Sequence, residues 1–117
     1  MDLIIVERKK NLIVKIQGDI DQHNAEEIRA KVDKEFERSR CRHMIFDFSG
    51  VSFMDSSGIG LLIGRYKSVT ARGGTVAIAN MNSDLGRIYN ISGLKKIISS
   101  FDSLDQAEKQ VENQAHA

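Results

Sequence analysis

The chain has 117 residues, 41% of them hydrophobic and 28% charged, as is typical of a globular protein with one modest core. Seventeen lysine and arginine residues nearly balance sixteen aspartate and glutamate residues. This balance argues against a nucleic-acid-binding protein, which needs a strongly basic face. No apolar run approaches the roughly 20 residues of a membrane helix, and the single cysteine suits a reducing compartment. We therefore expect a cytoplasmic protein that binds neither nucleic acid nor membrane.

The first third of the chain predicts two strands followed by a helix. Leu3–Glu7 and Leu12–Gln17 have the composition of strands and are separated by a polar gap of hairpin length. Apolar residues alternate in the second strand, so we expect one of its faces to lie in the core. A helix is expected from about Gln22 to Arg38, because its apolar residues recur at helical spacing. They are Ala25, Ile28, Val32 and Phe36.

Two residues compete for the start of this helix. Asn24 is followed three residues later by Glu27, a spacing typical of a capping box. Asp21 is the rival N-cap, because aspartate is also favoured at that position.

The middle third predicts a buried strand and a second helix. Met44–Phe48 is apolar on both faces except for Asp47, as in a central strand of a parallel sheet. The helix is expected from about Ser56 to Ala71. Its apolar stripe consists of Ile59, Leu62, Ile63, Tyr66 and Val69. Leu61 lies off this stripe, so we expect it to be exposed.

Gly60 and Gly64 lie on one face of the second helix, because they are four residues apart. Glycine inside a helix costs roughly 1 kcal/mol relative to alanine, which implies a reason for both residues. One interpretation is close packing of the helix on the sheet. The other is space for a partner protein.

The last third predicts two further strands and two helices. The expected strands are Thr75–Ala79 and Ile97–Ser99, and the expected helices are Ser83–Asn90 and one that begins at Ser103. Gly73 and Gly93 are predicted to end helices in the left-handed conformation. Gln106 follows Ser103 at capping-box spacing, and residues 112–117 are expected to fray.

This order of elements predicts an α/β fold. Strand–helix–strand crossovers imply parallel pairing, whereas the initial hairpin is antiparallel. We expect a single domain over residues 1–117, with its core at about 3–111. Its sheet should be mixed, mostly parallel and made of about four to five strands, with about four helices.

Ser56 and Ser57 lie where the buried strand gives way to the second helix. The first turn of a helix has free backbone N–H groups and a positive dipole end. Serine is a common N-cap, and the same geometry holds a phosphate well. A structural cap and a functional hydroxyl are therefore both open.

Metal and cofactor chemistry finds little support in the sequence. No histidine is spaced from another histidine, a cysteine or a carboxylate as metal ligands usually are. Asp19, Asp21 and His23 can gather at a loop, but solvated loop and cap residues are the simpler interpretation. We expect no metal and no cofactor.

Enzymatic motifs are also incomplete. A Ser-His-Asp triad would have to use one of the two serines with His23 or His43, yet the Gly-x-Ser-x-Gly elbow is absent. Gly58-Ile59-Gly60 lacks the third glycine of a dinucleotide-binding loop. Cys41 lies between two arginines that could lower its pKa, although a small apolar role is the alternative.

The segment from Ser52 to Gly60, with Gly64-Arg65-Tyr66-Lys67 after it, resembles the anti-sigma factor antagonists, the bacterial members of the STAS domain family. Gly18–Asp21 and Ser92–Ile98 match further landmarks of the family in the same order. The resemblance covers roughly residues 3 to 110.

The resemblance implies a non-enzymatic regulator of transcription in sporulation. In this family the unmodified antagonist binds an anti-sigma factor that is also a serine kinase, and the sigma factor is released. The kinase then phosphorylates the first serine of the motif, Ser56 here, and the complex separates. A PP2C-type phosphatase restores the serine. Ser57 is the rival acceptor.

We expect the docking face to surround this serine. Its candidate residues are Asp21, His23, Asp55, Ser56, Ser57, Gly58 and Ile59. Two alternatives remain at this stage. One is a STAS protein that serves a different anti-sigma kinase or a signalling scaffold, and the other is a small serine hydrolase with Ser56 as nucleophile.

Overall fold

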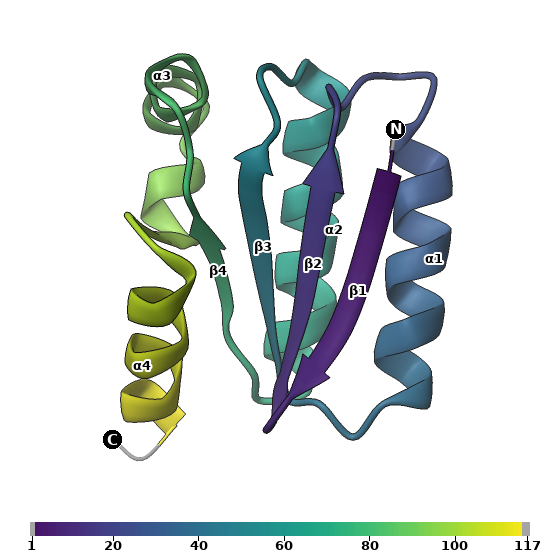
Figure 1. Cartoon of the computed structure of the whole chain (residues 1–117), viewed down its shortest axis with the longest axis vertical. Coiled ribbons are helices and arrows are strands. Elements are labelled where there is room, and N and C mark those ends of the chain that lie inside the picture. The colour runs from purple at the N-terminus through teal and green to yellow at the C-terminus, as the bar shows by residue number, and fades with distance from the viewer. Residues whose placement is uncertain (1, 116–117) are drawn as a thin grey trace.

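The computed structural model describes residues 2–115 as one five-stranded sheet between two helical layers (Figure 1). The strands are β1 (Asp2–Arg8), β2 (Asn11–Gln17), β3 (His43–Gly50), β4 (Val76–Ala79) and β5 (Ser99–Phe101). The helices are α1 (Ala25–Arg38), α2 (Ser56–Ala71), α3 (Ser83–Ile91) and α4 (Leu104–Ala115), with a 3-10 turn η1 (Leu94–Lys96). The predicted fold class is confirmed. No helix in this part of the chain is long and apolar enough to cross a bilayer.

The strands lie in the order β1-β2-β3-β4-β5. β1 and β2 form an antiparallel hairpin through a tight turn in which Lys9 has a φ of 58°. The remaining pairs are parallel. All three carboxyl ends of β2, β3 and β4 therefore meet at one edge of the sheet, where loops can form a common surface.

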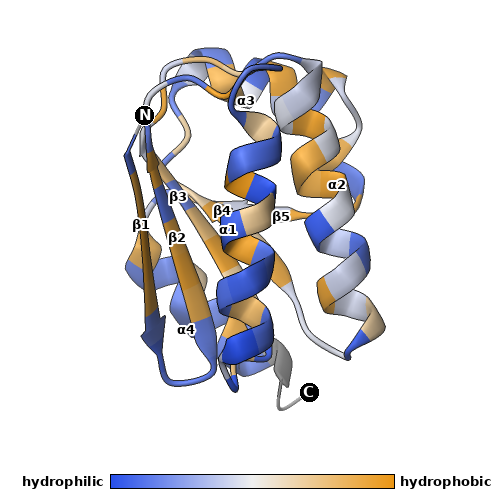
Figure 2. Ribbon diagram, turned by 90° about the vertical axis from the view of Figure 1, so that its right-hand side faces the viewer, coloured by the Kyte–Doolittle hydropathy of each residue, from blue (hydrophilic) through white to orange (hydrophobic). Residues whose placement is uncertain are grey.

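An apolar layer covers each face of the sheet (Figure 2). The larger layer contains the predicted stripe of α1, of which Ile28, Val32 and Phe36 are buried. The smaller layer lies under α4 and consists of Ile45, Ala77, Ala79, Ala107 and Val111. β3 is thus buried on both faces, as predicted for a central strand. β2 is also covered on its second face, because Ile13 is only 3% exposed.

The predicted exposure of Leu61 is wrong, since the residue is only 6% exposed. α2 packs on the sheet and also beside α1, so its buried arc is wider than one stripe. Leu61 and Arg65 turn toward α1 and are buried, whereas Ile59, Ile63 and Tyr66 are half-buried. A single-stripe pattern cannot describe a helix with two neighbours.

Several element boundaries also differ from the sequence prediction. The last strand is Ser99–Phe101, because η1 occupies the preceding residues and Ile98 N donates to Leu94 O. Ser103 Oγ accepts from Gln106 N as expected, but the Gln106 side chain accepts from Asp102 N. α4 continues to Ala115, and residues 116–117 of the expected frayed tail lie outside the described residues. The left-handed conformations of Gly73 and Gly93 are confirmed.

Gly58, rather than Gly60 or Gly64, is the glycine that close packing requires. A Cβ at position 58 would lie 2.8 Å from Met54 Cβ and 3.3 Å from Ile20 Cγ2. A Cβ at position 60 or 64 would meet nothing within 4 Å. Close packing of Gly60 and Gly64 on the sheet is therefore wrong, and their face of α2 is open.

We expect Gly58→Ala to destabilise the protein by about 1–3 kcal/mol through overpacking. Gly60→Ala is the matched control in the same helix and should stabilise by up to about 1 kcal/mol, because only the cost of helical glycine is removed. Urea unfolding of both variants measures the difference. Equal effects of the two substitutions would contradict this account of the first turn of α2.

His43 is buried at the start of β3, where its Nδ1 accepts a hydrogen bond from Thr75 N at 3.1 Å. Burial, with a smaller contribution from the charge of Arg42, lowers the pKa of His43 below its ordinary value of 6.5. The folded protein therefore holds this imidazole neutral at neutral pH.

This lowered pKa predicts a loss of stability on acidification. The contribution of neutral His43 is complete above pH 6.5 and declines as pH falls through the lower pKa of the folded state, because the unfolded chain binds the proton more readily. The free energy of unfolding should therefore depend less on pH in His43→Gln between neutral and mildly acidic solution. Parallel pH profiles of the two proteins would rule out this role.

Candidate functional site

Two loops at the carboxyl ends of β2 and β3 form an extended platform beyond the sheet. Gly18 N donates to Gly50 O at 2.9 Å. Beyond that bond, Ile20 and Met54 form an isolated parallel bridge. Ile20 N donates to Phe53 O, and Asp55 N donates to Ile20 O, each at 3.1 Å. The loop before α1 and the loop before α2 are thereby fixed to one another.

The carboxylates of the first loop shape this platform. Asp19 Oδ1 accepts from Phe53 N at 3.1 Å. Asp21 Oδ1 accepts from Asn24 N at 3.2 Å, while Asn24 Oδ1 accepts from Asp21 N at 3.0 Å. This reciprocal pair has the form of a capping box that starts at Asp21. Asn24 directly precedes α1, but its side chain makes no capping hydrogen bond to the helix, so the Asn24–Glu27 box is wrong. The Asp21 carboxylate instead caps the turn that leads into α1.

Asp55, and not a serine, caps α2. Its carboxylate accepts from Ser57 N at 2.8 Å, and its own backbone is extended. Ser56 is the first helical residue, is exposed, and makes no side-chain hydrogen bond within the described chain. Because Asp55 performs the structural task, the Ser56 hydroxyl is left free for chemistry.

Ser57 has different surroundings, because it is half-buried at the mouth of a cleft between α1 and α2. The cleft has a volume of about 200 Å³. Its other lining residues are Ala25, Glu26, Arg29, Gly60, Leu61 and Arg65. The two serines therefore differ in access, and Ser56 is the more accessible to a second protein.

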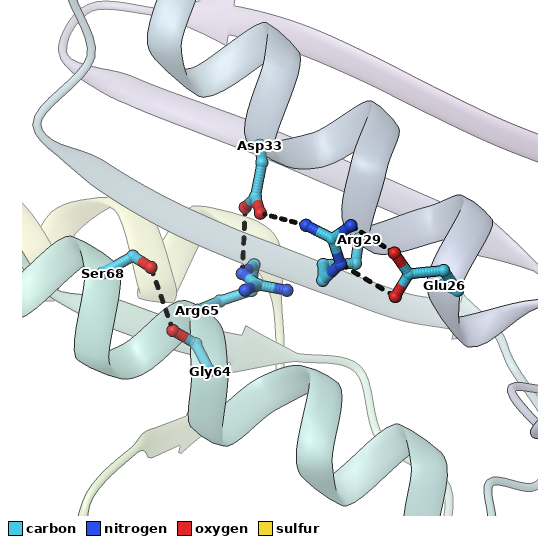
Figure 3. Close-up of polar contacts among 6 residues, drawn as sticks. All are labelled: Glu26, Arg29, Asp33, Gly64, Arg65 and Ser68. Carbon is cyan, nitrogen blue, oxygen red and sulfur yellow. Dashed lines mark hydrogen bonds and ion pairs between the residues drawn. The ribbon is translucent and has the colours of Figure 1, made fainter.

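A network of charges closes this cleft (Figure 3). Arg65 Nε lies 3.0 Å from Asp33 Oδ1, and Arg29 Nη1 lies 3.2 Å from Asp33 Oδ2. Arg29 also pairs with Glu26. Burial lowers the pKa of Arg65, although the charge of Asp33 opposes this shift. The sequence analysis did not select these residues for the site. For Glu26, Arg29 and Asp33 the signal was the i, i+3 and i, i+4 spacing of opposite charges along α1.

The geometry does not assemble the enzymatic alternatives. His43 begins β3, whereas Ser56 follows the opposite end of that strand, so this pair cannot form a triad. The His23 side chain is exposed at the surface. Among residues 2–113, no three histidine, cysteine or acidic side chains lie close enough to hold a metal ion. Burial raises the pKa of Cys41, which agrees with the small apolar role and not with a lowered thiol pKa.

The remaining candidate residues contribute unequally to the surface around Ser56. His23 is exposed, and Asp21 and Ile59 are half-buried. Gly58 is buried, so it shapes the surface from beneath. The sequence analysis missed Phe53, which is 50% exposed beside the motif. The signal was the position of Phe53 in the loop between a buried strand and a helix, where the alternation of buried and exposed residues along a strand no longer applies.

Comparisons with known proteins identify relatives of this chain. The family model described as "STAS domain" matches residues 2–107. The chain is 36% identical over 92 residues to an anti-sigma F factor antagonist of Paenibacillus polymyxa, which covers 79% of each chain. It is 32% identical over 94 residues to an anti-sigma-B factor antagonist of Bacillus subtilis (strain 168), covering 80% of this chain and 84% of the relative.

Solved structures of one antagonist, SpoIIAA, share the fold. Its unphosphorylated form has a TM-score of 0.82 and 26% identity, covering 96% of this chain and 97% of that one. The phosphorylated form of Bacillus SpoIIAA has a TM-score of 0.72 and 26% identity, covering 94% and 99% respectively.

We expect Asp55→Ala to lower the free energy of unfolding by about 1 kcal/mol, because the hydrogen bond to Ser57 N is lost. Asp55→Asn should retain most of the stability, since asparagine caps helices as well as aspartate does. Ser56→Ala should leave stability nearly unchanged. Thermal or urea unfolding of the three variants checks the assignment, which a large loss in Ser56→Ala would contradict.

Proposed function

This chain belongs to the STAS domain family and is an anti-sigma factor antagonist, and on that premise we propose that the Ser56 hydroxyl switches its binding to an anti-sigma factor. The unmodified protein binds an anti-sigma factor that is also a serine kinase, and the sigma factor is released. Phosphorylation of Ser56 ends this binding. A PP2C-type phosphatase restores the hydroxyl. The protein acts in the cytoplasm as a regulator and not as an enzyme.

The main support for this proposal is that the N-cap of α2 is Asp55 and not Ser56. Asp55 supplies the capping carboxylate, and Ser56 is exposed without a side-chain hydrogen bond. A kinase can therefore phosphorylate the Ser56 hydroxyl without breaking a side-chain hydrogen bond within the described chain. Ser57 is the less suitable acceptor, because it is half-buried in the α1–α2 cleft.

Electrostatics explains why phosphorylation can change binding but not the fold. A phosphoserine carries about −1.5 to −2 charges at neutral pH. The N-terminus of α2 stabilises negative charge, so the modified residue can be accommodated where it stands. A partner surface that fits the neutral serine must instead desolvate a phosphate beside Asp55, which can cost several kcal/mol. Each ~1.4 kcal/mol weakens binding tenfold.

The docking face that we propose surrounds Ser56 and continues onto the platform loops. It consists of Asp21, His23, Asp55, Ser56, Ser57, Ile59 and the exposed Phe53, with Gly58 beneath. Aromatic residues, phenylalanine among them, are enriched at protein interfaces relative to the rest of the surface. The open Gly60 and Gly64 face of α2 adjoins this region and leaves room for a partner.

We propose that the controlled sigma factor is of the sigma-F type, and hence that the protein serves transcription in sporulation. Two relatives at 36% and 31% identity are anti-sigma F factor antagonists. An anti-sigma-B factor antagonist at 32% identity supports a second candidate, control of a different sigma factor through its own anti-sigma kinase. Binding assays against both kinds of anti-sigma factor separate the two.

The decisive experiment incubates the protein with its anti-sigma kinase and ATP. Mass spectrometry should find one phosphate on wild type and on Ser57→Ala, but none on Ser56→Ala, because Ser56 is exposed at the start of α2 whereas Ser57 is half-buried in the cleft. Full phosphorylation of Ser56→Ala would show that the acceptor is another residue.

Binding measurements then test the switch itself. Phosphorylated protein should bind the anti-sigma factor at least about a hundredfold more weakly than unmodified protein, and Ser56→Asp should weaken binding in the same direction. Ser56→Ala should bind like wild type. Circular dichroism of the phosphorylated form should be unchanged, and equal affinity of the two forms would refute the proposal.

A further inference from the structure

The cleft between α1 and α2 opens beside the docking face, because Ser57 belongs to both. The α2 wall of the cleft is a row of residues at four-residue spacing, namely Ser57, Leu61 and Arg65. Ala25 of α1 and the exposed Gly60 of α2 also line it. Because these last two residues are small, the helices leave a hollow of about 200 Å³ between them. The proposed binding surface for the anti-sigma factor therefore continues into a recess.

Arg65 enters this cleft with hydrogen-bond donors that no residue of the described chain accepts. The residue is only 7% exposed, and its Nε lies 3.0 Å from Asp33 Oδ1 as an ion pair without hydrogen-bond alignment. This contact involves Nε alone, and no line joins the two terminal nitrogens to another residue in Figure 3. A guanidinium carries five N–H donors, and a buried donor without an acceptor is costly. An acceptor in the cleft would therefore stabilise this side chain.

Arg29 on the facing helix differs from Arg65, because all three of its nitrogens are used. Its Nε and Nη2 donate to Glu26, and its Nη1 donates to Asp33 at 3.2 Å. The two arginines and the two carboxylates balance in charge. A further carboxylate in the cleft would lie near Glu26 and Asp33, which would repel it. The charge balance therefore favours an uncharged acceptor for Arg65.

The Ser57 hydroxyl is a second polar group at the mouth of the cleft. Its backbone N–H donates to Asp55, but its half-buried hydroxyl makes no hydrogen bond within the described chain. Helical side chains lean toward the N-terminus of the helix, so the Arg65 guanidinium reaches back in the direction of Ser57. A peptide group offers a C=O to the guanidinium and an N–H to the hydroxyl. A carboxylate can only accept, so the two side chains together match a peptide group better.

We propose that a main-chain segment of the anti-sigma factor enters the α1–α2 cleft. Arg65 donates from its terminal nitrogens to a peptide carbonyl oxygen, and Ser57 Oγ accepts from a neighbouring peptide N–H. This inference rests on the proposed function, because the occupant belongs to the partner that binds the docking face. Gly60 selects a main chain over a side-chain amide. A Cβ at position 60 would meet nothing within 4 Å, so the backbone of a partner can pass close to α2 at this point.

The cleft and Ser56 then have separate roles in one interface. Ser56 lies outside the cleft lining, so its phosphorylation leaves the Arg65 contact geometry in place and determines whether the partner can approach. Arg65 contributes to the affinity of the unmodified protein. Every protein has peptide groups, so the cleft selects a partner by shape, requiring a segment narrow enough to pass between Gly60 and Ala25.

Binding titrations of Arg65→Lys with the anti-sigma factor test the contact. Lysine retains a positive charge beside Asp33, which keeps the ion pair, but it lacks the planar fork of terminal nitrogens. The dissociation constant should rise about ten- to hundredfold, as expected when a hydrogen bond to a charged group is lost. Arg72→Lys is the matched control, because Arg72 lies at the opposite end of α2 and pairs with Glu37. Unchanged binding of Arg65→Lys, or an equal rise in both variants, would overturn the proposal.

Gly60→Leu tests the cleft without touching Arg65. The substitution should preserve the fold, because position 60 is exposed and a Cβ there meets nothing within 4 Å, and urea unfolding checks this. The leucine side chain should fill the space that the partner's main chain needs, so binding should weaken at least about tenfold. Ser68→Leu is the control, since Ser68 is exposed two turns further along α2 and outside the cleft lining. Wild-type affinity in a folded Gly60→Leu variant would contradict the proposal.

A crystal structure of the complex between the unmodified protein and the anti-sigma factor identifies the occupant. A main-chain carbonyl oxygen of the partner should lie about 2.7–3.2 Å from a terminal nitrogen of Arg65. A partner carboxylate at this position, or a cleft that holds only water, would overturn the proposal. If wild type binds and is released by phosphorylation while Arg65→Lys binds equally well, this inference fails and the switch at Ser56 stands.

Discussion

The hydrogen bond from Ser57 N to the Asp55 carboxylate, 2.8 Å long, determines what the other residues of the site can do. It caps α2, and Asp55 N extends the connection to Ile20 O in the loop before α1. Without it, the first backbone N–H groups of α2 would need another acceptor, such as a serine hydroxyl or water. Because Asp55 caps the helix, the Ser56 hydroxyl is not needed for capping and is exposed at the surface.

Charge is distributed around this helix end in two separate compartments. In the α1–α2 cleft, Arg65 and Arg29 are matched by Asp33 and Glu26, so the cleft beside Ser57 is already balanced. Ser56 lies outside the cleft lining and faces solvent. An added phosphate at Ser56 therefore meets the positive end of α2 on its own chain. It alters what a partner encounters and leaves the internal network undisturbed.

Local sequence patterns predicted the element order, the burial of β3 and the position of the motif after that strand, because each depends on residues that are close in the chain. They failed where a second neighbour decides the outcome. Leu61 is buried by α1, which no stripe within α2 can reveal. The choice of Asp55 as cap depends on the backbone angle at which the chain enters α2. The exposure of Phe53 depends on the hydrogen bond that its backbone N–H donates to Asp19, a residue of the other loop.

The hydrogen bond between Asp19 and Phe53 joins residues that are 34 positions apart in the sequence. The surface around the motif therefore exists only in the folded chain. A nascent or partly unfolded chain contains the Asp-Ser-Ser-Gly letters, yet it lacks the surface on which they are displayed, because β2, α1 and β3 must first assemble. If the anti-sigma factor binds the proposed docking face, its binding requires the assembled fold as well as an unmodified Ser56. Under the proposed function, incompletely folded copies should therefore fail to bind the anti-sigma factor.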